Sequence, residues 1–144
     1  MHWLKYSGTL LVHRPQLGFR LLSAVVAGLF LLHGLAKVQH GLGWVEDALH
    51  TFGLPGFLAY GVYLGEVVAP LLVISGFFVA PAALVMAANM VMAIALAHGA
   101  QLFSLNPQTG GYALELQALY LAGSLAIAFM APGRGYKLTG ATHA

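Results

Sequence analysis

Apolar residues form four long stretches along the chain, and segments rich in glycine, proline and polar residues separate them. Each stretch holds about 18–20 residues, enough for a helix to cross the ~30 Å hydrocarbon core of a bilayer. Because a helix satisfies its own backbone hydrogen bonds, the pattern predicts an all-α, polytopic membrane protein with an antiparallel four-helix transmembrane bundle. The expected spans are Phe19–Val38, Phe57–Phe78, Pro81–His98 and Tyr112–Ala131.

The segments between the spans carry turn signals. Trp44–Thr51 is predicted to be a short helix at the membrane surface, and the Gly-Leu-Pro-Gly run soon after it predicts a turn. Before the first span, Trp3–Val12 suits either a short interfacial helix or an ordinary ordered tail, and the chain start lacks the pattern of a cleavable signal peptide. The expected divisions are an N-terminal tail (1–18), a membrane domain (19–138) and a C-terminal tail (139–144).

The second span contains residues that favour close contact and bending. Gly61 and Gly65 form a small-xxx-small pair, which lets a neighbouring helix approach. Pro70 lacks a backbone N–H and is expected to kink the helix just before it, close to Glu66. In a bundle, a neighbouring helix can satisfy the carbonyl that the proline frees.

Composition supports the membrane assignment and excludes several functions. Of 144 residues, 60% are hydrophobic and 7% are charged, whereas a soluble domain carries about 25% charged residues. The net charge of +2 comes without a basic patch interleaved with aromatic residues, so we expect no nucleic-acid partner. The chain has no cysteine, which excludes disulfides, iron–sulfur ligation, thiol catalysis and cysteine-based zinc sites.

The distribution of lysine and arginine predicts the orientation. These residues flank the first and fourth spans at the two chain ends, while the loops 39–56 and 99–111 have none. The positive-inside rule then predicts that both termini lie in the cytoplasm. The expected location is a bacterial cytoplasmic (inner) membrane. Lys37, at the outer end of the first span, is the exception. The flanking basic residues are Lys5, Arg14, Arg20, Arg134 and Lys137.

A few polar residues interrupt the spans. Glu66 and Asn89 lie nearer the midplane, and His33 and Lys37 share a face of the first span. A lone charge at membrane depth costs at least about 2.5–3.5 kcal/mol, so such groups are expected to pair or to serve a site. We predict one polar pocket that opens to the outer side. The candidates are Glu66 as the catalytic residue and His33, Lys37, Asn89 and Glu115 as ligand-binding residues.

Each candidate also has a structural interpretation. Glu66 would be satisfied by Lys37 or by a backbone group, and Lys37 would extend to water at the membrane surface. His33 would bond to a carbonyl one turn away. Glu115 would complement a helix macrodipole, and Asn89 would link two helices. Because no two histidines lie three or four residues apart and no His-x-x-Glu pair occurs, we predict no metal or haem.

At these residues the chain resembles the DoxX family of small four-span membrane proteins. The likeness covers Arg14–Leu138 and depends on the combination of pieces rather than on any single one. The resemblance implies a compact four-helix membrane bundle. Named relatives include a subunit of an archaeal thiosulfate:quinone oxidoreductase and accessory membrane partners in redox or detoxification gene sets. The matching pieces are Arg20, Phe30–Lys37, Gly53–Pro55, Glu66, Gly76, Gly110–Tyr112 with Glu115, and Pro132–Arg134.

Three functions of different classes follow. In the first, the protein is an accessory subunit of a membrane redox system, in which Lys37 or His33 donates to a quinone carbonyl and Glu66 passes the proton. The chain has no electron-transfer centre, so we expect it not to be catalytic without a partner protein. In the second, it is a non-catalytic adapter that holds a soluble or secreted partner through its two outer loops. In the third, it carries a small molecule or lipid, which with four spans would require a homo-oligomer.

Overall fold

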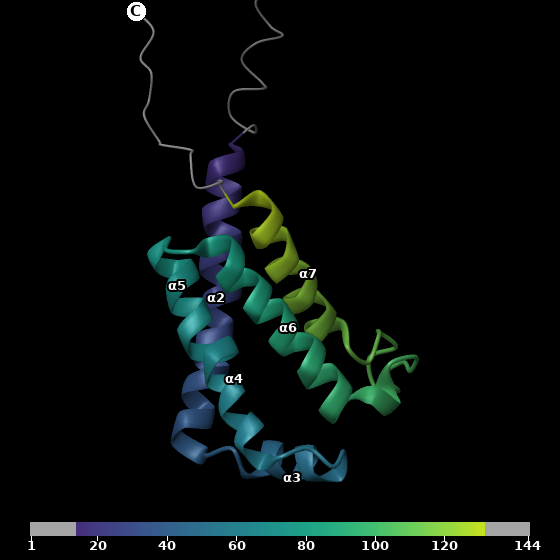
Figure 1. Cartoon of the computed structure of the whole chain (residues 1–144). Helices are drawn as coiled ribbons and strands as arrows, with labels where there is room; N and C mark the ends of the chain where they lie inside the picture. The colour runs from purple at the N-terminus through teal and green to yellow at the C-terminus, as the bar shows by residue number, and fades with distance from the viewer. Residues whose placement is uncertain (1–13, 132–144) are drawn as a thin grey trace, which may run out of the picture.

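The described part of the protein is built from helices. The computed structural model describes residues 14–131 (Figure 1). Within that range the only strand-like feature is an isolated bridge between Leu105 and Tyr112. These helices confirm the all-α class. The predictions for the two tails, including a helix over Trp3–Val12, lie outside the described residues.

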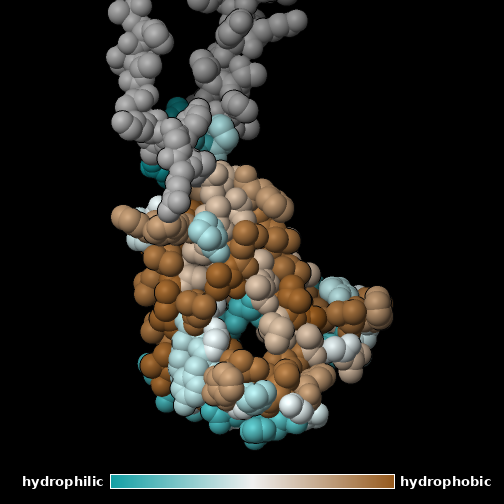
Figure 2. Space-filling model, in the orientation of Figure 1, coloured by the Kyte–Doolittle hydropathy of each residue, from teal (hydrophilic) through white to brown (hydrophobic). Residues whose placement is uncertain are grey.

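Three helical segments are long and apolar enough to cross a membrane. Figure 2 shows the matching surface on the face in view, where apolar residues cover the middle of the molecule and hydrophilic residues gather towards the ends. Length, composition and this surface confirm a multi-pass membrane protein. The three segments are Pro15–His40, Gly56–Ser75 and Val79–Ala97.

The first helix, α2 (Pro15–His40), extends beyond the expected span Phe19–Val38 at both ends. Pro15 begins the helix, because the missing N–H of a proline is not needed in the first turn. At the other end Gly41 adopts φ 84°, a left-handed value that favours glycine, and its N–H donates to the Lys37 carbonyl.

A short helix, α3 (Gly43–Thr51), follows at the position predicted from Trp44–Thr51. Figure 1 shows it lying across the end of the longer helices. Its buried residues Val45 and Leu49 pack with Leu42 and Ala59 in a small apolar cluster separate from the main core. This cluster attaches α3 to the start of the second spanning segment.

The second spanning segment is helical throughout but irregular. It consists of η2 (Gly56–Tyr60), α4 (Gly61–Tyr63), η3 (Leu64–Val68) and α5 (Ala69–Ser75). The η3 part is one π-helical turn, in which the Ala69 N–H donates to the carbonyl five residues back. Such turns occur often at functional sites. The irregularity lies directly before Pro70, where the sequence predicts a disturbed helix, and it contains Glu66.

A tight hairpin joins α5 to α6 (Val79–Ala97). Gly76 takes φ 77°, its N–H donates to the Val73 carbonyl, and the Phe77 N–H donates to the Leu72 carbonyl. This pair of hydrogen bonds is a Schellman motif, which ends a helix at a left-handed glycine. Pro81 lies in the first turn of α6, where a proline is tolerated.

The fourth apolar helix, α7 (Glu115–Met130), is shorter than the expected span Tyr112–Ala131. Tyr112 forms a bridge with Leu105, and the Ala113 N–H donates to Ser104, so these residues belong to an ordered loop. A helix of 16 residues rises only about 24 Å. The fourth crossing, and with it the complete four-helix bundle, therefore stays a prediction.

The main core lies where the long helices meet. The helix α6 packs against α5 and α7, and α2 packs against the same two helices. Phe30, Met86 and Ile127 are the large side chains at its centre, while Ala27 and Ala83 allow close approach. In lipid, such contacts stabilise through van der Waals packing rather than through water exclusion. Figure 1 shows that α2 begins and α7 ends at the same end of the molecule.

Candidate functional site

The polar centre of the protein is an ion pair between two different helices. Lys37 Nζ on α2 lies 2.5 Å from Glu66 Oε1 in the π turn. The Asn89 amide on α6 donates to the same oxygen at 3.1 Å. Glu66 is only 4% exposed, and Oε2 has no hydrogen-bond partner among the described residues. Three helices are thus tied to one buried carboxylate, which keeps one oxygen available for a further donor or proton.

Backbone irregularity supports the position of Glu66. Pro70 cannot donate the usual helical hydrogen bond to the Glu66 carbonyl, four residues before it. Gly34 of α2 lies so close to this carbonyl that a Cβ at position 34 would overlap it. The glycine therefore lets α2 approach the disturbed turn and brings Lys37, one turn further along the same helix, within reach of the carboxylate.

Aromatic side chains surround Lys37. Its Nζ lies 5.5 Å from the centre of the Trp44 ring, a distance at which the ring face attracts a cation. The Tyr63 hydroxyl donates to the Lys37 carbonyl at 3.3 Å. Because Trp44 belongs to α3, the ion pair is covered from the end of the molecule where α3 lies. Lys37 therefore does not extend freely to water, contrary to one interpretation of the sequence.

A cavity of about 250 Å³ adjoins the ion pair. We call it the polar cavity. Residues of α2, α3, the π turn, α6 and α7 form its wall, and Phe30 and Met90 contribute apolar surface. The polar groups on the wall are His33, Lys37, Glu66, His98, Gln117 and Tyr120. An apolar space with a few convergent polar groups is typical of a small-molecule site.

His33 and Tyr120 meet at this cavity. Their rings are 5.7 Å apart and nearly perpendicular, and Tyr120 also packs edge to face on Phe30. His33 Nδ1 bonds to the Leu29 carbonyl at 2.9 Å, which leaves Nε2 free to act in the cavity. The Tyr120 hydroxyl makes no hydrogen bond to any other residue in the range 14–131, so it too is available to a ligand.

A second polar group lies where the end of α6 meets α7. Gln117 Nε2 of α7 approaches His98 Nε2 at 3.4 Å, and His98 Nδ1 lies 3.3 Å from Gln101 Oε1. If the Gln101 oxygen accepts from Nδ1, then Nε2 of the neutral ring accepts from the Gln117 amide. These contacts join the end of α6 to the first turns of α7 and fix the imidazole beside the cavity.

Two of the predicted ligand-binding residues do not line the polar cavity. Glu115 is exposed at the start of α7, beside Gly111, and does not line the polar cavity. The reason is that α7 starts at this residue, so the face towards the cavity begins at Leu116 and Gln117. Asn89 holds Glu66 but lines two other spaces.

Those two spaces continue from the polar cavity towards the lipid-facing side. The first, which we call the neck, has a volume of about 40 Å³ and shares Lys37, Trp44 and Glu66 with the polar cavity. The second, the apolar groove, holds about 290 Å³ between α3, the second spanning segment and α6. Figure 2 shows a dark hollow in the apolar surface in the lower part of the molecule, with hydrophilic atoms at its upper edge.

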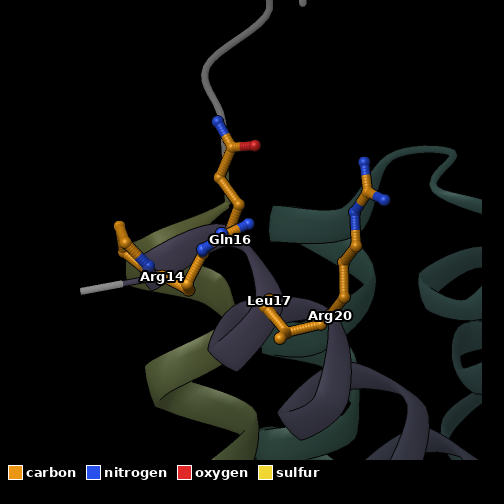
Figure 3. A pocket seen from close by; sticks show the side chains of 5 residues that line it. Arg14, Gln16, Leu17 and Arg20 are labelled. Carbon is orange, nitrogen blue, oxygen red and sulfur yellow. The ribbon is translucent and has the colours of Figure 1, made fainter. Parts of the chain in front are cut away.

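Another hollow, of about 400 Å³, lies away from this chemistry at the start of α2. Figure 3 shows Arg14, Gln16 and Arg20 extending from the first turns of this one helix. Their side chains spread apart instead of converging on a point, so the hollow has no organised set of ligand donors. The role of Arg14 and Arg20 in orientation, expected from the sequence, stays a prediction.

The residues present determine which groups the site can hold. Within residues 14–131, no three side chains of histidine, aspartate or glutamate gather closely enough to hold a metal ion. Donors and acceptors at the polar cavity instead suit an organic molecule with oxygen atoms.

A comparison with known protein families shows to which family the chain belongs. The DoxX family profile matches residues 17–99, more than half of the chain. The chain belongs to the DoxX family. No curated protein and no solved structure matches it. The matched range contains Gly34, Lys37, Glu66 and Asn89, so the family region of this DoxX protein includes the whole ion-pair cluster.

Sequence reasoning missed several residues of the site in this DoxX protein. Tyr120 and Gln117 lie on α7, outside the family match, and Trp44 was expected only at the membrane surface. A signal was present for Tyr120, because a hydroxyl in the middle of an apolar helix requires a partner or a ligand. Gln117 offered a similar signal as a lone amide close to a helix start.

Proposed function

We propose that this DoxX protein is an accessory subunit of a membrane redox system and that its polar cavity binds the headgroup of a quinone. The observation that supports the proposal best is the unpaired Tyr120 hydroxyl beside the Lys37–Glu66 pair in one largely apolar cavity. A quinone ring is apolar, with a carbonyl at each end. It needs an apolar space and a few hydrogen-bond donors, which this cavity offers.

In this proposal the donors to the quinone carbonyls are Tyr120 and Lys37. The ammonium of Lys37 has three N–H donors, of which one points at Glu66, so others remain for a ligand. Glu66 takes up and passes a proton through Oε2, the oxygen without a partner in the described range. His33 Nε2 provides another polar contact at the wall.

The proposed chemistry needs a partner protein. Reduction of a quinone to a quinol takes two electrons and two protons. The chain has no cysteine to ligate an iron–sulfur cluster, so a partner with its own redox centre would supply the electrons. The protein then contributes the binding site and the route for protons, and it is not an enzyme in isolation.

We further propose that the protein lies in a bacterial cytoplasmic membrane with four crossings and both termini in the cytoplasm. The common end at which α2 begins and α7 ends supports this orientation, as do Arg14 and Arg20 at that end. The polar cavity and α3 would then lie towards the outer side.

The proposal is tested with the double variant Glu66→Gln/Lys37→Met, which removes both charges and keeps the net charge of the protein. Small molecules that co-purify in mild detergent are identified by mass spectrometry. We expect quinone with the wild type and its loss with the double variant. The control is Asp47→Asn, the same carboxylate-to-amide change at an exposed position of α3. Equal quinone in both variants, or none with the wild type, would contradict the proposal.

An adapter role has its own supporting observation. Phe103 is 96% exposed in the loop between α6 and α7, and Leu105 beside it is also exposed. This loop is ordered, because the Tyr112 hydroxyl donates to the Leu102 carbonyl at 2.8 Å. An exposed apolar surface on an ordered loop can receive a partner protein. Phe103→Ser/Leu105→Ser should abolish capture of such a partner while the quinone content stays unchanged.

A further inference from the structure

We infer that the apolar groove holds the hydrocarbon tail of the ligand whose headgroup occupies the polar cavity. The inference depends on the proposed function and extends it, because it assigns the ligand to the class of tailed, membrane-soluble quinones and gives their route of entry. The ligand would come from the bilayer through the space between α4 and α6, instead of from the aqueous end.

The groove has the chemistry of a tail site. Its walls come from α3, the second spanning segment and α6, and Asn89 is its only polar side chain. Gly61 and Ala88 leave the middle of the groove open on two facing walls. Nothing in the described protein lies within 4 Å of the position that a Cβ on Gly61 would take. A flexible hydrocarbon chain matches such a surface, since it offers no hydrogen-bonding groups.

The groove and the polar cavity are connected by the neck. The neck shares Val62, Asn89 and Met92 with the groove, and it shares Lys37 and Glu66 with the polar cavity. At about 40 Å³ it admits a thin chain but no ring. Met92 is unbranched and half exposed, so its side chain can shift to let a larger group pass.

The arrangement of polarity matches a molecule with a head and a tail. Polar groups line the inner cavity, and apolar groups line the groove at the lipid-facing side. The opposite approach is covered by α3, whose Trp44 ring lies over Lys37. Figure 2 shows the hollow on the apolar surface with hydrophilic atoms at its upper edge, which is the view that an approaching lipid-soluble molecule would have.

The experiment compares two probes and three variants in lipid nanodiscs. The probes are a benzoquinone without a tail and the same headgroup with a decyl chain. Binding is followed by quenching of Trp44 fluorescence in a Trp3→Phe background. Gly61→Leu and Ala88→Leu fill the groove from its two walls. The matched control is Gly28→Leu, because Gly28 also has open space at its Cβ position but lies on α2 outside the groove.

We expect both groove variants to weaken binding of the decyl probe at least about tenfold, and to leave the tailless probe and the control unchanged. Partition of each probe into lipid is the same for all variants, so the comparison isolates the groove. Equal effects on both probes, or an effect on neither, would overturn the inference and leave headgroup binding standing. If the wild type binds neither probe, the proposed function itself is wrong and the inference falls with it.

Discussion

Gly34 of α2 lies directly against the peptide carbonyl of Glu66, at the one turn of the second spanning segment that Pro70 disturbs. The contact joins the two helices by backbone, and the Lys37–Glu66 ion pair joins them by side chains one turn away. A steric requirement and an electrostatic one thus act on the same pair of helices.

The steric requirement predicts that Gly34→Ala destabilises the protein. The added methyl would overlap the Glu66 carbonyl and a Val67 methyl group, so the helices must separate. Overpacking of this kind typically costs about 1–3 kcal/mol. Thermal unfolding in detergent measures the change. The control is Gly28→Ala, with open space at its Cβ position, which should be neutral or slightly stabilising.

The ion pair predicts a strong non-additivity. Lys37→Met alone leaves a buried carboxylate without its counter-ion, and breaking a buried pair from one side costs about 3–5 kcal/mol. The double variant Glu66→Gln/Lys37→Met removes both charges and should recover much of that loss. A double-mutant cycle on unfolding measures the coupling between the two residues. If the two single changes simply add, the pair contributes nothing to the fold.

Asn89 and Gly65 should also depend on each other. A Cβ at position 65 would lie 2.5 Å from the Asn89 Cβ, so Gly65→Ala must displace the amide that donates to Glu66. We expect a loss of stability larger than that of Asn89→Ala, which removes one hydrogen bond worth about 0.5–1.5 kcal/mol. Combining the two substitutions should relieve only the overlap with the amide group, because alanine keeps the Cβ at position 89, so part of the loss should remain. The prediction fails if Gly65→Ala unfolds at the wild-type temperature.

A substitution of Tyr120 should change quinone binding without changing the stability of the protein. Its hydroxyl is unpaired in the described range, so Tyr120→Phe should leave the unfolding temperature unchanged. If the hydroxyl donates to a quinone carbonyl, the same change should weaken quinone binding about threefold to tenfold, the value of one hydrogen bond. Phe129→Leu on the exposed surface of α7 serves as the control and should change neither quantity. Unaltered binding in Tyr120→Phe would remove this residue from the proposed site.

The predicted orientation can be tested with few changes, because the chain has no cysteine. A single cysteine at Gln108, in the loop between α6 and α7, should react with a membrane-impermeant thiol reagent added to intact cells. A reporter that is active only in the cytoplasm should be active when fused at Ala144. Labelling of Gln108→Cys only after cell lysis would reverse the orientation.

Much of the arrangement around Glu66 follows from local chemistry in the sequence. A proline four residues after a membrane glutamate predicts a disturbed turn, and a lysine in the neighbouring span predicts a partner for the charge. The structure brings these groups together. His33 forms the bond to a carbonyl one turn away that its structural interpretation describes, and it still lines the polar cavity.

The part of the site on α7 could not be derived in the same way. Which residues of a helix face a cavity depends on where the helix starts, and a shift of one residue turns the face by about 100°. Tyr112 and Ala113 pair with the preceding loop, so α7 starts at Glu115 and presents Gln117 and Tyr120 instead. These pairings depend on the backbone conformation of the loop, which hydropathy along the chain does not record.

The position of the ion pair in the chain also bears on how the protein enters the membrane. Lys37 and Glu66 belong to consecutive apolar helices, and an unpaired charge opposes insertion of its helix. The cost is about 2.5–3.5 kcal/mol for a charge near the midplane such as Glu66, and less for Lys37 in the last turn of α2. Because α3 and a short turn are all that joins these helices, the two charges can meet during synthesis. We expect the first two helices to leave the translocon together as a hairpin, with the salt bridge formed before α6 is made.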